Sequence, residues 1–505
     1  MFTLLKKMMQ NELLGRSALI DVSYEEALKT LTLSLQSNAA YLQSVQNVND
    51  PAKLKETEKY LLRSGITLEQ LDSLSVIHVA GTKGKGSTCA FTEAILRQHG
   101  FSTGFFSSPH LVSVRERIRL NGEPISRSHF TRSFWNVYRN LERKREYESD
   151  MPTYFRFLTI LTFHVFLEAN VDVAIVEVGI GGELDSTNVL RNPVCVGVTS
   201  LALEHTALLG NTLEAIAHQK SGIFKPHARA FTVPQAESAM RVLRARAEER
   251  RCRDELRVVQ PDDNRWNDVL TSAGVDVNGI QRQNALLSID LAHEWMKSRC
   301  GAPSLIAENK YINGFHADIN SNKDSAQVIS SDKVAVALAD CKWPGRTQIL
   351  RTSVADFFLD GAHTVESIDN CVLWFNRASR KTSTKFLIFN TSGDRDSQVL
   401  LKRLKPLNFD KAYFTPNQSG VASVEDLNAM LCAVISKQME KCEKQCEWWG
   451  EGSVLKKNVA EVLCDIKRCA PPQIDKVEIL VTGSLHLIGV LLTILDPDLT
   501  MTSDF

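Results

Sequence analysis

The feature that most constrains the fold is an apolar run that leads directly into a loop of glycines and lysines. Residues 76–80 read Val-Ile-His-Val-Ala, the loop at 81–87 reads Gly-Thr-Lys-Gly-Lys-Gly-Ser, and residues 90–99 have a helical pattern. A buried strand, a glycine-rich loop and a helix in this order open many α/β nucleotide-binding domains. The sequence therefore predicts such a domain in the N-terminal half of the chain.

The glycine and lysine loop has the composition of a phosphate site. Glycines let successive backbone N–H groups turn toward a phosphate, the following helix presents its positive end, and a lysine adds a mobile charge. The strict P-loop pattern is not matched, because Gly86 separates Lys85 from Ser87. A flexible glycine turn with solvated lysines is the structural alternative. The predicted phosphate-binding residues are Gly84, Lys85, Gly86 and Ser87.

Length, charge and cysteine usage exclude several other classes. The chain has 505 residues, which at about 150 residues per domain indicates two or three domains. Lys and Arg number 59, as do Asp and Glu, so no global attraction to nucleic acid is expected. The 11 cysteines include no Cys-x-x-Cys pair, which favours reduced thiols over disulfides or a zinc site. The charge-free stretch at 479–495 is shorter than the roughly 20 residues of a membrane span, so it predicts a strand, a turn and a helix.

Two further apolar runs end at polar residues. The run at 171–178 carries Glu177 near its end and is followed by glycines, and the run at 194–199 leads to His205. Parallel strands direct their ligands to their carboxyl ends, so Glu177 is a candidate magnesium ligand and His205 lies on the same edge. A turn-capping role for Glu177 and a structural role for His205 are the alternatives.

The remaining pattern indicates a second α/β region. Apolar runs at 356–359, 386–390, 412–415 and 477–482 alternate with helical segments, and we place the boundary near residue 340. The polar regions at 241–257 and 309–332 are interpreted as loops. The first 20 residues carry Lys and Arg with one acid, which fits either a mitochondrial targeting segment or a frayed amphipathic helix.

Eight motifs, collinear along nearly the whole chain, resemble the folylpolyglutamate synthase family of the Mur ligase superfamily. They are Gly81 to Ser87, Phe105 to Leu111, Arg115 to Ile118, Glu177 to Gly182, His205-Thr206, Lys220 to Lys225, Trp343 to Gln348 and Leu359 to Thr364. The resemblance implies an α/β fold in which an N-terminal P-loop-type ATP-binding domain with a mainly parallel sheet is joined to a smaller C-terminal Rossmann-like domain. The expected parts are a targeting segment at 1–20, the ATP- and folate-binding domain at 21–340 and the C-terminal domain at 341–505.

The resemblance also implies the activity. Family members are ATP-dependent ligases that add L-glutamate, through γ-linked amide bonds, to tetrahydrofolate and its polyglutamates via an acyl phosphate. The expected partners are ATP, L-glutamate and reduced folates, with Mg²⁺ and a monovalent cation such as K⁺ as cofactors. A bifunctional dihydrofolate synthase/folylpolyglutamate synthase and a non-catalytic nucleotide-binding switch are the alternatives. We further expect a monomer without a transmembrane segment or nucleic-acid partner. Its expected location is the cytoplasm, and also mitochondria if the first 20 residues act as a targeting segment.

The site residues that the resemblance implies fall into three groups. The metal ligands are Ser108, Glu177 and His205. The nucleotide-binding residues outside the loop are Arg346 and Asp360. The catalytic residues are Lys85, His363 and Lys220, the last of which is either a carbamylated lysine or an unmodified one.

Two departures from the family pattern and one electrostatic expectation complete the picture. Glu204 stands before the metal-site histidine where family members usually have Asp, and Glu183-Leu184 follows the glycines where smaller residues are typical. Because ATP, folate tails and glutamate are anionic, a chain of zero net charge must hold a locally basic region. We expect it around Lys83, Lys85, Arg117 and Arg346.

Overall fold

A computed structural model describes most of the chain as two compact units. The described residues are 23–35, 52–260, 263–275, 279–300, 329–381, 383–391, 395–418, 432–469, 476–503 and 505. The larger unit comprises Leu35–Ser108 and Arg117–Cys341. The smaller unit comprises the described residues up to Ser34, the segment Pro109–Glu116 and residues Lys342–Phe505.

The larger unit is built on an eight-stranded sheet with the order β4-β3-β2-β5-β1-β6-β7-β8. The six strands β2-β5-β1-β6-β7-β8 are parallel to one another. Strands β3 and β4 extend the sheet at the β2 edge and pair in the antiparallel direction. The central strands are fully buried apolar runs, as a parallel sheet covered on both faces requires. The strands are β1 (Val76–Ala80), β2 (Thr103–Phe106), β3 (Ile118–Leu120), β4 (Glu123–Pro124), β5 (Val173–Glu177), β6 (Cys195–Val198), β7 (Arg229–Thr232) and β8 (Arg253–Val258).

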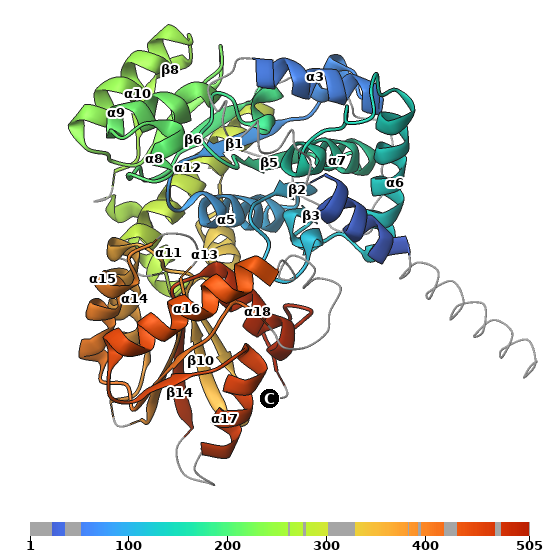
Figure 1. Cartoon of the computed structure of the whole chain (residues 1–505). Helices are drawn as coiled ribbons and strands as arrows, with labels where there is room; N and C mark the ends of the chain where they lie inside the picture. The colour runs from blue at the N-terminus through green and yellow to red at the C-terminus, as the bar shows by residue number, and fades with distance from the viewer. Residues whose placement is uncertain are drawn as a thin grey trace, which may run out of the picture. The chain divides into compact units, whose positions relative to one another are not determined.

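Helices cover both faces of this sheet. Helices α5 and α12 pack together on one face, where Leu291 of α12 contacts Gly197 of β6 (Figure 1). Helices α9 and α10 pack on the other face, against Val196, Val198 and Ala230. The helices are α3 (Ala52–Ser64), α4 (Leu68–Asp72), α5 (Lys85–Gln98), α6 (Arg127–Arg143), α7 (Tyr154–Ala169), α8 (Thr206–Leu209), α9 (Leu213–Lys220), α10 (Glu237–Glu249), α11 (Asn267–Ser272), α12 (Ile280–Cys300) and α13 (Ser331–Ala339), with the short 3₁₀ turns η3 (Ser186–Val189), η4 (Ser221–Ile223) and η5 (Asn264–Trp266).

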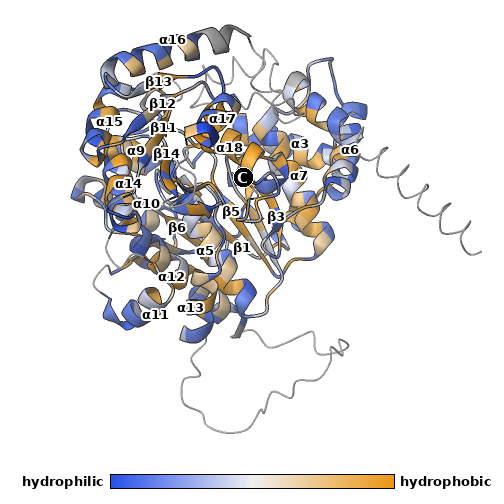
Figure 2. Cartoon of the chain, turned by 90° about the horizontal axis from the view of Figure 1, so that it is seen from below, coloured by the Kyte–Doolittle hydropathy of each residue, from blue (hydrophilic) through white to orange (hydrophobic). Residues whose placement is uncertain are grey.

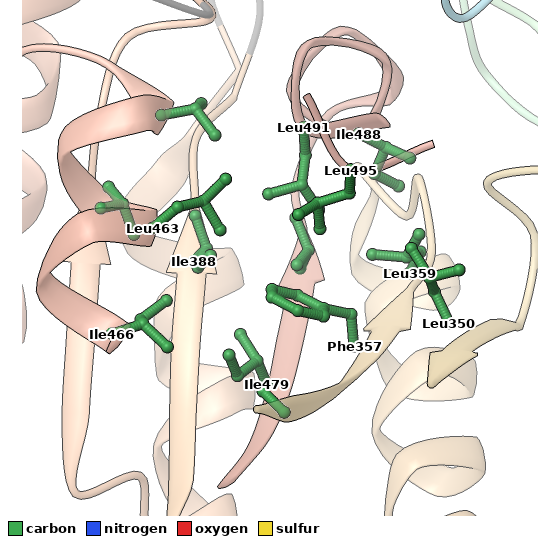
Figure 3. Close-up of a cluster of buried hydrophobic side chains, with 14 of the residues drawn as sticks. Leu350, Phe357, Leu359, Ile388, Leu463, Ile466, Ile479, Ile488, Leu491 and Leu495 are labelled. Carbon is green, nitrogen blue, oxygen red and sulfur yellow. The ribbon is translucent and has the colours of Figure 1, made fainter. Parts of the chain in front are cut away.

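The smaller unit has its own six-stranded sheet with the order β13-β12-β11-β14-β10-β9, parallel except for the edge strand β9. Side chains alternate between its two faces. Phe357 and Leu359 of β10 join the core beneath α17 and α18, whereas Phe358 joins the core beneath α14, α15 and α16. Figure 3 shows the first of these cores, and Figure 2 shows apolar residues concentrated on the strands. The elements are η1 (Thr30–Ser34), a π-helical turn, then η2 (Val114–Arg117), β9 (Gln348–Arg351), β10 (Ala355–Leu359), α14 (Val365–Ala378), β11 (Lys385–Phe389), α15 (Ser397–Leu404), η6 (Lys405–Leu407), β12 (Lys411–Phe414), α16 (Cys432–Trp449), β13 (Ser453–Leu455), α17 (Val459–Cys469), β14 (Val477–Thr482) and α18 (Leu485–Leu495).

The segment Pro109–Glu116 packs within the smaller unit although its chain neighbours belong to the larger one. Val112 is part of the core that contains Leu350 and Ile488. The Glu116 carboxylate accepts hydrogen bonds from the backbone N–H groups of residues 111, 112 and 113, at 3.0, 2.8 and 2.5 Å. The Glu116 side chain therefore fixes the turn that brings Leu111 and Val112 to that core.

The expected α/β class, with two mainly parallel sheets, is confirmed. The stretch 479–495 forms most of β14 and all of α18, as predicted, and α3 begins directly after Pro51. In the part of the chain that the structure describes, nine cysteines are free thiols, among them the buried Cys89 and Cys195, as predicted. Within the described ranges, no helix combines the length and apolar character needed to cross a membrane.

The prediction of a loop at 241–257 is wrong. This region contains most of α10 and all of β8 except its last residue, Val258. Its arginines hide an amphipathic pattern, because Ala239, Met240, Leu243 and Ala247 form a buried face. The other predicted loop, 309–332, lies outside the described residues up to 328, and α13 begins at Ser331.

Candidate functional site

The glycine loop joins β1 to α5 in a backbone conformation that requires glycine. Gly81 and Gly84 have φ angles of 148° and 91°, and a Cβ on Gly81 would lie 1.7 Å from Thr199 Oγ1. The backbone N–H groups of Thr82 and Lys83 donate to Ser200 O at 3.0 and 3.1 Å. Helix α5 begins at Lys85 without a side-chain cap, so its first N–H groups are available to an anion. The loop therefore has the geometry of a phosphate site.

Two lysines lie at this loop. Lys220, at the end of α9, is 4% exposed and donates from Nζ to Gly81 O at 2.7 Å. Lys85 donates from Nζ to Thr82 O at 3.4 Å. Burial and, after it, the Lys85 charge lower the pKa of Lys220 to about 7, although the Glu204 and Asp185 carboxylates act to raise it. The structure thus brings two predicted catalytic lysines to one loop.

The predicted metal ligands belong to segments at or after the ends of three strands of the larger sheet, β2, β5 and β6. Glu177 ends β5, is 4% exposed, and accepts a hydrogen bond at Oε2 from the backbone N–H of Ser108 at 3.0 Å. His205 precedes α8 with a left-handed φ of 52° and follows Glu204, whose charge acts on Lys220. Among the described residues, no group of three or more His, Cys, Asp and Glu side chains is arranged as a metal site. A carboxylate beside a serine nevertheless fits a hard cation whose other ligands are water or phosphate oxygens.

Buried polar groups hold the turn that follows Glu177. Asp185 accepts hydrogen bonds from the backbone N–H groups of Ile180 and Thr187, both at 3.0 Å, and from the Thr187 hydroxyl at 2.6 Å. Burial raises the pKa of Asp185, and these hydrogen bonds oppose that rise. The Thr187 hydroxyl also contacts Nε2 of His78, at 2.8 Å, in the central strand β1. The glycine turn is therefore anchored to the middle of the sheet.

Two residues at this site were missed by sequence reasoning. Asn284 of α12 is buried, and a Cβ on Gly84 would lie 2.2 Å from its Oδ1, so the amide lies directly against the phosphate loop. Gln235 accepts from the backbone N–H of Leu201 and donates to Thr199 O, both at 3.0 Å, and so holds the loop that leads to Glu204. Neither residue lies in a local motif, because each acts on a loop far away in sequence.

The smaller unit brings its three predicted site residues together. Asp360 follows β10 and accepts hydrogen bonds from the backbone N–H groups of Thr347 at 2.9 Å and Ala362 at 3.0 Å. Burial raises the pKa of the Asp360 carboxyl, and the Arg346 charge opposes that rise. A Cβ on Gly361 would lie 2.7 Å from Arg346 Nη1, and His363 Nδ1 lies 2.8 Å from Gly361 O.

The four cations of the expected basic region are divided between the two units. Lys83, Lys85 and Arg117 belong to the larger unit, and Arg346 belongs to the smaller one. The Arg117 guanidinium lies over the Tyr154 ring, 5.5 Å from its centroid. Each unit thus carries cations beside strand ends, which suits anionic ligands.

A glycine loop between strand and helix in one mainly parallel α/β unit, and a half-buried Arg346–Asp360 pair in a second, are typical of two-unit nucleotide-binding proteins. Solved structures share this fold. The apo form of L. casei FPGS gives a TM-score of 0.68 at 22% identity, covering 93% of this chain and 98% of that one. The Mycobacterium tuberculosis folylpolyglutamate synthase complexed with ADP and AMPPCP gives 0.64 at 23%, covering 88% and 98%. The bifunctional folylpolyglutamate synthase/dihydrofolate synthase from Yersinia pestis CO92 gives 0.63 at 23%, covering 90% and 97%.

Curated relatives identify the family. The mitochondrial folylpolyglutamate synthase of Cricetulus griseus is 44% identical over 453 residues, which are 85% of this chain and 74% of that protein. The Homo sapiens enzyme is 44% identical over 448 residues, with the same coverage. No family model matches the chain. At this identity and coverage, the chain belongs to the folylpolyglutamate synthase family.

Proposed function

We propose that the chain is the ATP-dependent ligase that joins L-glutamate, through a γ-linked amide bond, to tetrahydrofolate and its polyglutamates. The observation that carries this proposal is the 44% identity over 85% of the chain to folylpolyglutamate synthases. Further support comes from the phosphate loop at the start of α5, from Glu177 beside Ser108, and from Arg346 beside Asp360.

The chemistry explains why ATP is needed. A carboxylate does not react with an amine at neutral pH, because the leaving group would be oxide. When a folate γ-carboxylate oxygen attacks the γ-phosphorus of ATP, ADP leaves and an acyl phosphate forms. The glutamate nitrogen then attacks the acyl carbon, loses a proton, and inorganic phosphate leaves. The protein contributes positioning and compensation of negative charge to both steps.

The residues present can supply these contributions. The N–H groups at the start of α5, together with Gly84, Gly86 and Ser87, hold the phosphates, and Lys85 neutralises charge on the transferred phosphoryl group. Arg346 and Asp360 bind the nucleotide, since a guanidinium bridges phosphate oxygens and a carboxylate accepts from ribose hydroxyls. His363 acts near the phosphoryl group.

The metal proposal concerns the segments at the carboxyl ends of β2, β5 and β6. Ser108, Glu177 and His205 would hold Mg²⁺, which when bound shields the phosphate oxygens from the attacking carboxylate. Lys220 is proposed as a carbamylated lysine, since a buried amine with a pKa of about 7 is partly neutral and nucleophilic at neutral pH. A monovalent cation such as K⁺ is a further proposed cofactor.

The proposed organisation is that of a monomer without a nucleic-acid partner. Residues 21–340 form the ATP- and folate-binding domain and 341–505 the C-terminal domain. Relatives named as mitochondrial support a mitochondrial location beside the cytoplasmic one, with residues 1–20 as the targeting segment.

One assay tests the activity and its alternatives. The protein is incubated with ATP, Mg²⁺, labelled glutamate and either tetrahydrofolate or dihydropteroate. Label in the tetrahydrofolate product alone is the expected result. Label with both acceptors would establish the bifunctional activity, which a structural neighbour carries in its name. Label with neither would leave a nucleotide-binding protein and contradict the proposal.

A further inference from the structure

Glu183, directly after the glycine turn of β5, connects that turn to helix α10. Its carboxylate accepts hydrogen bonds from Nη2 of Arg246 and from Nη2 of Arg250. The Arg246 side chain is only 7% exposed, and that of Glu183 is 25% exposed. Charge-assisted pairs with so little solvent hold their geometry more tightly than surface ion pairs do. The turn after β5 is therefore held in place by two arginines that belong to another part of the unit.

The same turn lies against the end of α9. The Glu183 N–H donates to Gln219 O at 2.7 Å. Gly182 is so close to the helix that a Cβ there would lie 2.7 Å from Lys220 O, and a Cβ on Gly222 would lie 2.3 Å from Glu183 Cα. Turn and helix end thus have no room to shift independently.

A third connection closes the arrangement. The Asn188 amide donates from Nδ2 to Glu183 O at 2.8 Å and to Gly222 O at 3.1 Å. It therefore bridges the turn to the residues just after α9. The end of α9 is held by backbone contacts on one side. On the other side it is held, through Glu183, by Arg246 of α10 and by Arg250 directly after that helix.

Lys220 is the residue that this arrangement positions. It is the last residue of α9, and its Nζ reaches Gly81 O at 2.7 Å at the start of the phosphate loop. We propose that Glu183 is a positioning residue, which fixes the end of α9 through Arg246 and Arg250 and so places Lys220 against the phosphate loop. The proposal rests on the ligase function proposed above, because its kinetic readout is ATP-dependent glutamate addition.

Glu249 offers a matched control, because it forms an ion pair with the same Arg246 but does not contact the turn. Glu249 accepts from Arg246 Nη1 at 2.9 Å through both carboxylate oxygens, and its side chain is 61% exposed. Glu249→Gln removes a carboxylate from the same arginine without touching the turn. Glu183→Gln removes the carboxylate that touches the turn and leaves a buried guanidinium with a weaker acceptor.

The first measurement is kinetic. We expect Glu183→Gln to lower kcat about tenfold or more, since small displacements of a catalytic group cost one to two orders of magnitude, with the KM for the folate within about twofold of wild type. Glu249→Gln should stay within about twofold in both parameters. Glu183→Asp, which keeps the charge, should recover part of the lost kcat.

The second measurement needs no activity. The substrate-free proteins are treated with acetic anhydride, and acetylation of Lys220 is measured by peptide mass spectrometry relative to Lys476, which donates to Thr352 O in the smaller unit. Glu183→Gln should raise the Lys220 ratio about fivefold or more, and Glu249→Gln should not change it. Arg250→Gln, at a half-exposed position, tests the same connection if Glu183→Gln does not fold, and should raise the ratio as well.

The outcomes separate the two proposals. A Glu183→Gln protein with a lower melting temperature but wild-type kcat and Lys220 reactivity would overturn the positioning role and leave the ligase function intact. A wild-type protein without ligase activity would overturn the function, while the acetylation ratio would still decide whether Glu183 positions Lys220.

Discussion

The two units place charged side chains at the same kind of position, the carboxyl ends of parallel strands, but hold them in opposite ways. In the larger unit the buried charge is Lys220, which has a backbone carbonyl as its acceptor and another cation, Lys85, nearby. In the smaller unit it is Asp360, which has two backbone donors and the cation Arg346 beside it. The larger unit therefore hydrogen-bonds its two amines to backbone carbonyls, with the Glu204 and Asp185 charges acting on Lys220, and we call it the uncompensated side. The smaller unit places a cation beside its carboxylate, and we call it the compensated side.

The largest effect should come from the uncompensated side. Lys85→Ala is expected to lower kcat by about 1000-fold, the cost of removing one preorganised group that stabilises transition-state charge. Unfolding should be almost unchanged, because the Lys85 contact with Thr82 O is long, at 3.4 Å. Labelled-glutamate kinetics and thermal melts measure the two quantities. Lys83→Ala in the same loop is the control, and a Lys85→Ala protein with wild-type kcat would remove the phosphate-loop assignment.

Arg346→Lys tests the compensated side. The ammonium keeps the charge beside Asp360 but loses the planar fork, so we expect kcat/KM for ATP to fall about 100-fold while the KM for glutamate stays the same. Arg351→Lys is the control, because that arginine is 71% exposed and its pair with Asp356 at 3.3 Å contributes little. Equal effects of the two substitutions would show that Arg346 is an ordinary surface cation.

Lys220→Met should change how stability depends on pH. The pKa of Lys220 is about 7 in the folded chain against 10.5 ordinarily, so between these values the unfolded chain holds a proton that the folded chain lacks. The free energy of unfolding therefore rises with pH in this window, and the full penalty remains below pH 7. From pH 7 to 8.5 wild type should gain about 2 kcal/mol relative to Lys220→Met, measured by denaturant unfolding in buffer free of carbon dioxide. Parallel pH profiles would contradict the burial of this charge.

The smallest effect is expected at the loop junction. The Thr82 hydroxyl accepts from Ala202 N at 3.1 Å and donates to Ala202 O at 3.2 Å. Thr82→Val should lower the free energy of unfolding by about 1 kcal/mol or slightly more, because it leaves two backbone groups poorly paired. Thr271→Val, at an exposed position, should stay within about 0.5 kcal/mol. Denaturant unfolding of both variants measures the difference.

Local patterns predicted what depends on local order. The run 76–80 and its glycine loop predicted β1 and the start of α5, because burial, turn and helix follow one another along the chain. The strand-end argument predicted that Glu177 lies at the ligand edge of the sheet, and the resemblance added Ser108, whose N–H it contacts. The roles proposed for these residues stay predictions.

Contacts between residues far apart in sequence explain why the loop prediction at 241–257 failed and why Asn284 was not predicted. In the sequence, the many arginines near α10 suggest a solvated loop. In the structure, Arg246 and Arg250 pair with Glu183, which lies more than fifty residues earlier in the chain. Asn284 gives no local signal either, because its contact with the phosphate loop exists only after α12 packs beside α5. Patterns with a period of a few residues do not encode such pairings.

The segment Pro109–Glu116 determines how the protein can be divided. Leu111 and Val112 fill space beside Gly345, Leu350 and Ile488 in the smaller unit, yet they are encoded within the N-terminal half of the gene. A fragment that starts at residue 342 would lack the segment Pro109–Glu116 and would expose the apolar core that Leu111 and Val112 cover. The smaller unit is thus not encoded by one continuous stretch of sequence. Two-fragment complementation should therefore succeed only when the cut leaves residues 109–116 able to reach their core.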